Sequence, residues 1–269
     1  MPAANVSDLS QVHPLATVAE DVEIGPFTVI GPKVRIGRGC RIANNVTITG
    51  DTSLGEFNRV FPGAVLGTEP QDLKYVGELS YLEIGDHNTI REFATINTGT
   101  EANDGRTIVG NNNLLMSYVH VAHDCVLGDS IIVSSGAMMA GHVEVLDHAV
   151  IGGGAGVHHF ATIGRHAFVS AMSGLRTDAP PFLICEGVPA KVRGVNVVGM
   201  KRHGHTHDQV AAVKETFRIL YRSNSNFRDA VKELEDLCTV FEEVREIVDF
   251  LERMEQGRKG RFKELTRPY

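Results

Sequence analysis

Aliphatic residues recur at every sixth position over most of residues 12–169. The first run is Val12, Val18, Ile24, Ile30, Ile36, Ile42, Ile48, Leu54, Val60 and Leu66, and the period resumes at Ile84 and, after a shift, from Val109 to Val169. A period of six is incompatible with an amphipathic helix, whose apolar stripe repeats every 3.6 residues. It is typical of short strands of β-branched residues that are separated by corners and stacked as a parallel β-helix.

Two polar stretches interrupt this period. Residues 68–83 carry both signs of charge and include Asp72, Lys74 and Tyr75, whereas residues 99–107 are short and polar. Surface loops carry binding and catalytic residues more often than regular elements do, although many are simply tolerated insertions. We interpret the first stretch as the rim of a binding cleft and the second as a tolerated surface insertion.

A different pattern begins after Gly174, where the six-residue period ends. A proline-marked segment at 179–196 leads to apolar residues at helical spacing from Thr206 onwards, with Asp208 as the expected N-cap. Asn226 is expected to cap a second helix, and an acidic third helix follows. This pattern indicates a small helical unit at the C-terminus.

The predicted fold class is therefore mainly β. It consists of a parallel β-helix over residues 1–190, with loop insertions near 68–83 and 99–107, followed by a small α-helical C-terminal domain over residues 191–269.

Composition excludes several classes of function. The 269-residue chain has a net charge of −7, which argues against nucleic-acid binding because phosphate neutralisation needs a basic surface. We expect no transmembrane segment and a cytoplasmic location, because no apolar run could span a bilayer and the N-terminus does not resemble a secretion signal. The four cysteines form no CxxC pair and fit small core residues in a reducing compartment.

The hexads resemble those of the hexapeptide-repeat acyltransferases, whose fold is a left-handed parallel β-helix of triangular cross-section. This resemblance implies three hexads per coil, so that residues 18 apart lie above one another. The left hand also comes from the resemblance, because right-handed crossovers are the general rule for parallel strands. With this spacing, Gly141 stacks on His123, and His142 stacks on Asp124.

Histidines are concentrated in residues 114–160, which contain His120, His123, His142, His158 and His159. Regular coils have no structural need for imidazoles, so we interpret this cluster as functional. One possibility is a zinc site with an open position, as in a lyase or hydrolase. The other is acid–base catalysis, with His123 as the base and Asp124 orienting it. The adjacent acid and the glycine-rich surroundings, which offer backbone amides to an oxyanion, favour acid–base catalysis.

Five motifs in this order resemble those of the UDP-N-acetylglucosamine 3-O-acyltransferases of lipid A biosynthesis: QDLKY, NLLMSYVHVAHDC, AGHVEV, IGGGAGVHHF and RGVNVVGMKRHG. The resemblance covers nearly the whole chain. It implies transfer of a (3-hydroxy)acyl chain from acyl carrier protein to the 3-hydroxyl of UDP-N-acetylglucosamine, the first step of lipid A biosynthesis, without a metal. A 3-amino sugar nucleotide is an alternative acceptor.

The resemblance also implies a role for individual residues. His123 would take the proton of the sugar hydroxyl, Asp124 would orient His123, and the amide of Gly141 would stabilise the oxyanion. The residues implied in substrate binding are Asp72, Lys74, His120, His142, His158, His159, Asn196 and Arg202. The residues implied in measuring the acyl chain are Ala171, Met172 and Pro189.

The same resemblance implies a homotrimer with active sites between subunits. It implies no cofactor, since phosphopantetheine arrives on the acyl carrier protein. The chain departs from the family where His159, Pro189, Val198 and His203 stand. The family often has glutamine, an acid and a second arginine at the positions of His159, Val198 and His203, and some members have a histidine at the position of Pro189. We expect these differences to affect nucleotide binding and chain-length selection.

Overall fold

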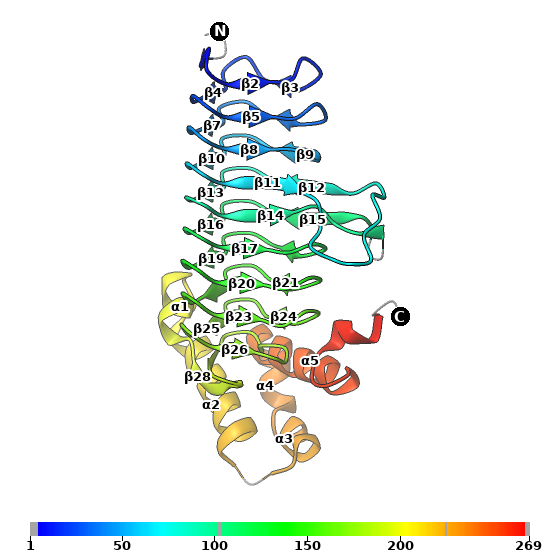
Figure 1. The fold of residues 1–269 in the computed structure, drawn as a ribbon. Coiled ribbons are helices and arrows are strands. Elements are labelled where there is room, and N and C mark those ends of the chain that lie inside the picture. The colour runs from blue at the N-terminus through cyan, green and yellow to red at the C-terminus, as the bar shows by residue number, and fades with distance from the viewer. Residues whose placement is uncertain (1–4, 102–103, 224, 267–269) are drawn as a thin grey trace.

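The computed structural model describes residues 5–101, 104–223 and 225–266. It shows a long prism of stacked coils, with the N-terminus at one end and helices packed around the other (Figure 1). The predicted mainly β architecture, a left-handed β-helix followed by a small helical region, is confirmed.

Three sheets form the sides of the prism in the described part of the chain. Sheet A contains β1 (Asn5–Val6), β4 (Glu23–Ile24), β7 (Arg41–Ile42), β10 (Arg59–Val60), β13 (Thr89–Ile90), β16 (Leu114–Leu115), β19 (Ile132–Val133), β22 (Val150–Ile151), β25 (Phe168–Val169), β27 (Leu183–Gly187) and β28 (Ala190–Val195). Sheet B contains β2 (Gln11–Val12), β5 (Val29–Ile30), β8 (Thr47–Ile48), β11 (Val65–Thr68), β14 (Thr95–Asn97), β17 (His120–Val121), β20 (Met138–Met139), β23 (Gly156–Val157) and β26 (Gly174–Leu175). Sheet C contains β3 (Thr17–Val18), β6 (Arg35–Ile36), β9 (Asp51–Leu54), β12 (Tyr81–Ile84), β15 (Arg106–Val109), β18 (Val126–Leu127), β21 (Glu144–Val145) and β24 (Thr162–Ile163).

Parallel pairing joins each strand from β1 to β23 to the strand three places later. Met138 lies opposite both His120 and Gly156, so paired residues are 18 positions apart. From β4 to β26 the second residue of each two-residue strand is buried in the core, and Ile48 and Val121 have no exposed surface. Branched aliphatic side chains pack well on such a pleated surface, which explains the six-residue period.

The corner between sheets B and C repeats an unusual backbone conformation. Asp124, His142 and Phe160 have φ angles of +61°, +63° and +62°. This left-handed region is uncommon outside glycine and is least favourable for bulky residues such as phenylalanine. Because it recurs every 18 residues, the coil itself imposes it. It places the three side chains above one another.

Both insertions leave the prism at this same corner, one between β11 and β12 and the other between β14 and β15 (Figure 1). Arg59 pairs with Thr89, 30 positions later, and Thr89 pairs with Leu114, 25 positions later. The sheets nevertheless remain continuous. The extra residues therefore lie outside the coils without shifting their register.

The prism ends in an antiparallel hairpin of β27 and β28, and the expected domain boundary after residue 190 lies inside β28. The helices that follow are α1 (Val197–Arg202), α2 (His207–Arg222), α3 (Phe227–Glu233), α4 (Glu235–Val240), α5 (Glu242–Gln256) and the 3-10 helix η2 (Phe262–Thr266).

Helix α2 is capped by Thr206. The Thr206 hydroxyl accepts a hydrogen bond from the Gln209 amide, and the Gln209 side chain accepts one from the Thr206 amide. This reciprocal pair is a capping box. Asp208, the expected N-cap, lies in the first turn, so that prediction was wrong. Asn226 caps α3 as expected.

The helices pack on the last coils through a second apolar core. Phe182 and Leu183 are buried there against Met200, Val213 and Ile247. None of the helices in the described ranges is long and apolar enough to cross a membrane.

Candidate active site

The candidate site occupies the corner between sheets B and C. His123 and Asp124 follow β17, Gly141 and His142 follow β20, and the next coil places Phe160 after β23. Each of these segments turns the same corner, one coil after another. The two columns predicted from the 18-residue spacing are therefore present.

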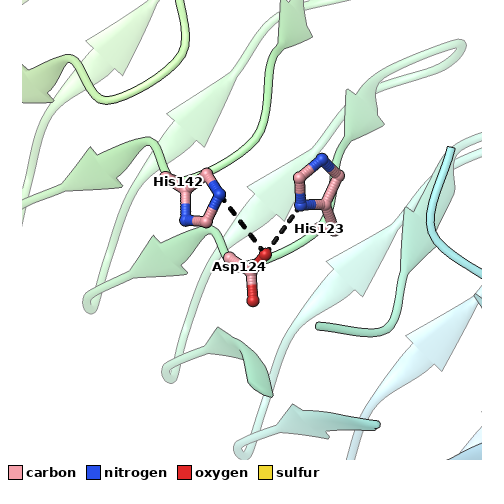
Figure 2. A group of neighbouring side chains, drawn as sticks. All are labelled: His123, Asp124 and His142. Carbon is pink, nitrogen blue, oxygen red and sulfur yellow. Dashed lines mark hydrogen bonds and ion pairs between the residues drawn. The ribbon is translucent and has the colours of Figure 1, made fainter. Parts of the chain in front are cut away.

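Asp124 is the buried centre of this corner, with no exposed surface. Its Oδ2 lies 2.7 Å from Nδ1 of His123 (Figure 2). Because an ionised carboxylate can only accept, we assign the hydrogen to Nδ1, which leaves Nε2 of His123 as an acceptor. This is the tautomer that a general base requires.

Two threonines hold Asp124, Thr100 in the insertion between β14 and β15 and Thr107 in β15 itself. The amide and hydroxyl of Thr100 donate to its carboxylate at 2.8 and 2.6 Å, and its own amide donates to the Thr107 hydroxyl at 2.9 Å. Residues 99–107 were expected to be only a tolerated surface insertion, and that expectation was wrong. The stretch positions the aspartate beneath His123.

His142 lies on the other side of Asp124, with Nε2 3.6 Å from Oδ2. Its ring stacks on Phe160 at a centroid distance of 4.3 Å and meets the His123 ring edge-on at 5.2 Å. Burial lowers the pKa of His142 to about 4, although the Asp124 carboxylate opposes this shift. At neutral pH His142 is therefore an uncharged hydrogen-bonding group.

Gly141 faces the ring of His123. A Cβ atom at this position would lie 2.5 Å from Cε1 and 2.6 Å from Nε2 of His123, so the close approach requires glycine. Its carbonyl accepts from the Phe160 amide, but the Gly141 amide has no acceptor among the described residues. Gly141 thus packs against the His123 ring and carries an amide N–H that no described residue accepts.

A cavity of about 700 Å³ opens in front of these groups. The first insertion contributes Gln71, Asp72, Lys74 and Tyr75 to its wall, and the coils contribute His120, His123, Gly141, His142, His159 and Phe160. The structure thus brings His123, Gly141 and five of the eight predicted substrate-binding residues to one cavity. Phe160 was not among the predicted site residues, although its 18-residue spacing from His142 was a usable signal.

His120 and His158 flank this cavity differently. Nδ1 of His120 is 2.8 Å from the Thr95 hydroxyl, and burial lowers the pKa of the His120 imidazole. His158 does not line the cavity. It follows β23 directly before His159 and faces the adjoining cleft, with its ring 3.8 Å from that of His159.

The remaining predicted residues lie away from the cavity within a single chain. Asn196 caps α1, since its side chain accepts from the Gly199 amide and donates to the His166 carbonyl. Arg202 lies in the last turn of that helix. The expected ruler residues Ala171 and Met172 follow β25 at the corner between sheets A and B, and Pro189 lies in the turn between β27 and β28.

The donor atoms of His123, Asp124 and His142 lie within 4.8 Å of one another, a spacing compatible with a metal ion. However, both carboxylate oxygens of Asp124 already accept hydrogen bonds from Thr100, and one also accepts from His123. A metal would have to displace these bonds. The arrangement fits an oriented base better than a ligand set.

Comparisons with known proteins agree with this geometry. Residues 178–260 match a family described as UDP N-acetylglucosamine O-acyltransferase, domain 2, and residues 15–50 match bacterial transferase hexapeptide repeats. The acyl-[acyl-carrier-protein]–UDP-N-acetylglucosamine O-acyltransferase of Thiobacillus denitrificans is 43% identical over 254 residues, which cover 94% of this chain and 98% of that protein.

Solved structures are also similar. The UDP-N-acetylglucosamine acyltransferase of Bacteroides fragilis has a TM-score of 0.89 at 41% identity, covering 92% of this chain and 96% of that one. The Arabidopsis enzyme has a TM-score of 0.83 at 30% identity, covering 94% and 97%. With similarity of this extent in both sequence and structure, the chain belongs to the UDP-N-acetylglucosamine O-acyltransferase family.

Proposed function

We propose that this protein transfers a (3-hydroxy)acyl chain from acyl carrier protein to the 3-hydroxyl of UDP-N-acetylglucosamine, the first step of lipid A biosynthesis. The names of its relatives support these substrates. The observation that carries the proposal is the contact of His123, oriented by Asp124, with Gly141, whose amide is free. Base and oxyanion donor thus face one cavity.

In the proposed reaction, Nε2 of His123 takes the proton of the sugar hydroxyl as its oxygen attacks the thioester carbonyl. The carbonyl oxygen becomes an oxyanion, to which the Gly141 amide donates a hydrogen bond. Collapse of the tetrahedral intermediate breaks the carbon–sulfur bond. The departing phosphopantetheine thiolate recovers the proton from His123, and the ester remains on the sugar.

Electrostatics at the corner favour this proton transfer. Asp124 is fully buried, so its charge stabilises the imidazolium of His123 with little screening by water. His142 stays neutral beside it, because burial lowers its pKa to about 4. It can therefore orient a substrate without opposing the positive charge that forms on His123.

Substrate binding is assigned to the cavity wall. Asp72, Lys74, His120 and His159 join His142 in contacting the sugar and the acyl group, a role supported by their places around the cavity. His158, next to His159 in the same coil, extends this wall.

Asn196 and Arg202 bind the nucleotide phosphates from a neighbouring subunit in this proposal, because both lie outside the cavity of their own chain. The acyl ruler formed by Ala171, Met172 and Pro189 likewise requires a second subunit. The functional unit is thus a homotrimer with sites between subunits, and its cytoplasmic location stays a prediction.

The test is a transfer assay with purified acyl carrier protein loaded with 3-hydroxyacyl chains of several lengths. UDP-N-acetylglucosamine and its 3-amino analogue are offered separately, and products are identified by mass. We expect an ester product that is lost about 10²–10⁴-fold in the His123→Ala variant, the usual cost of losing a general base. If no chain length gives a product with either acceptor, the proposed function is wrong.

A further inference from the structure

A cationic cleft opens at the same corner, one coil beyond His159. Arg176 and Thr177 follow β26 as His158 and His159 follow β23. The cleft has a volume of about 420 Å³, and its lining residues are His158, His159, Arg176, Thr177, Lys259, Arg261 and Glu264. It adjoins the reaction cavity, since His159 lines both.

The outer wall of this cleft is a turn at residues 257–262 that is fixed to the corner. The Asp178 amide donates to the Gly260 carbonyl at 2.8 Å, and its carboxylate accepts from the Phe262 amide at 2.9 Å. Gly260 has a φ of +69°, and a Cβ there would lie 3.0 Å from Thr177. These contacts hold the turn at residues 257–262 in a single position against the coil.

The charge of the cleft comes from two side chains. Arg261 is buried and compensated, because it pairs with Glu264 at 2.9 Å and donates to the Arg176 carbonyl. The side chains of Arg176 and Lys259 are exposed, and neither forms an ion pair with any residue that the structure describes. Two uncompensated cations thus flank the cleft in a protein of net charge −7.

The prosthetic arm of the acyl donor must leave the reaction cavity through a neighbouring cleft, and the cationic cleft adjoins this cavity at His159. On the opposite side of the first insertion lies another cavity, of about 720 Å³, whose wall carries Asp51, Glu69 and Glu78 against the single cation Lys33. A phosphodiester would be repelled there and attracted to the cationic cleft.

We propose that Arg176 and Lys259 bind the phosphodiester of the phosphopantetheine arm while its thioester lies between His123 and Gly141. This inference rests on the proposed function. Thr177 lies two coils from Gly141, about 10 Å at the usual strand spacing, a distance that an extended pantetheine arm spans. Arginine suits the task because its guanidinium presents a fixed fork of donors to phosphate oxygens.

The test compares acyl-phosphopantetheine with acyl-pantetheine, which lacks the phosphate, as donors at saturating UDP-N-acetylglucosamine. We expect the wild type to favour the phosphorylated donor about tenfold or more in kcat/KM, the usual effect of charged hydrogen bonds. The Arg176→Ala/Lys259→Ala variant should lose this preference and keep its KM for the sugar nucleotide. Arg176→Lys/Lys259→Arg should retain most of it.

Lys33→Ala serves as the matched control, because it removes a cation from the cavity on the opposite side, and it should keep the wild-type preference. An unchanged preference in the double alanine variant would overturn the inference. So would a raised KM for UDP-N-acetylglucosamine with the donor preference intact, since the cleft would then hold the diphosphate of the sugar nucleotide.

Calorimetric titration separates this inference from the proposed function, because it needs no turnover. Phosphopantetheine should bind the wild type more tightly than pantetheine does, and the double alanine variant should abolish the difference. Equal binding of the two compounds by the wild type would refute the phosphate site. A wild type that binds phosphopantetheine in this way yet forms no acylated sugar would refute the proposed reaction alone.

Discussion

Asp124 combines a structural and a chemical task at one position. Its left-handed backbone turns the corner, and its carboxylate accepts hydrogen bonds from Thr100 and His123 without contact with solvent. A buried charge is tolerated only when its oxygens are satisfied. The amide and hydroxyl of Thr100 satisfy both carboxylate oxygens before the reaction starts, so His123 is oriented without further rearrangement.

At residue scale, Gly141→Ala should disable the site without unfolding the protein. The new methyl group would lie within 2.6 Å of Cε1 and Nε2 of His123, so the ring must move out of its hydrogen-bonded position. We expect kcat to fall about 10²-fold or more, as for loss of a positioned catalytic group, with a smaller change in KM.

Gly194→Ala is the control for this substitution, because a Cβ at Gly194 meets no atom within 4 Å. It should leave kcat unchanged. Steady-state kinetics and thermal unfolding of both variants make the comparison. A Gly141→Ala variant with wild-type kcat would show that the His123 position is not critical.

Part of this site follows from the six-residue period, once the resemblance to the hexapeptide-repeat acyltransferases supplies three hexads per coil. The 18-residue period placed Gly141 next to His123 and His142 next to Asp124, and the distances confirm both neighbours. The period could not reveal Thr100, because the insertion that carries it breaks the spacing. A contact between an irregular loop and a coil depends on how the loop folds back, which no periodic pattern records.

At the scale of elements, the second insertion is part of the site. Thr100→Val removes one donor to the buried Asp124 carboxylate while keeping the size of the side chain. We expect the free energy of unfolding to fall by about 1.5–3 kcal/mol, the usual value for a hydrogen bond to a charged group, and kcat to fall with it.

Thr98→Val is the matched control, because the Thr98 hydroxyl bonds to Ser80 at the same corner and does not contact Asp124. It should lower stability but leave kcat near the wild-type value. Denaturant unfolding and kinetics distinguish the two variants. Equal effects on kcat would mean that Thr100 acts only through general stability.

A stack of histidines joins the last coils to the helices. The ring of His166 lies 4.7 Å from that of His148, 4.9 Å from that of His203 and 5.1 Å from that of His205. Burial, the neighbouring histidines and Arg165 lower the pKa of His166 to about 3. The His166 imidazole is therefore neutral in the folded protein at any pH where the protein works.

Acid should weaken the packing of His166 between the coils and the helices, and so lower the stability of the protein. The unfolded chain binds a proton at His166 below a pH of about 6.5, whereas the folded chain does so only near 3, so stability from this residue is lost as pH falls between those values. The thermal midpoint of His166→Gln should therefore decline less than that of the wild type between pH 7 and pH 4.5. His13→Gln, at an exposed position, should follow the wild type. A His166→Gln curve parallel to the wild type would contradict this reasoning.

At the scale of the whole molecule, the single chain does not bring all its predicted site residues together. If Arg202 serves the cavity of a neighbouring subunit, inactive His123→Ala and Arg202→Ala chains should restore activity when co-expressed. In randomly mixed trimers about a quarter of the sites would combine an intact His123 with an intact Arg202 from the next subunit.

Each variant expressed alone provides the baseline, and a His123→Ala/Arg202→Ala chain co-expressed with His123→Ala is the control that should stay inactive. Sedimentation should give three chains per particle. Failure of mixed trimers to recover activity would place Arg202 outside the reaction or within its own subunit.

The coils are continuous across both insertions, so the distance between His123 and Gly141 does not depend on the length of either loop. Strand pairing resumes after 30 or 25 residues as it does after 18, so a longer or shorter loop leaves the spacing of His123 and Gly141 unchanged. Substrate selection can therefore diversify in the first insertion, which lines the cavity without contacting Asp124, while the second insertion must keep Thr100 in place. In such a protein, a grafted first insertion offers a direct way to change the acceptor without rebuilding the catalyst.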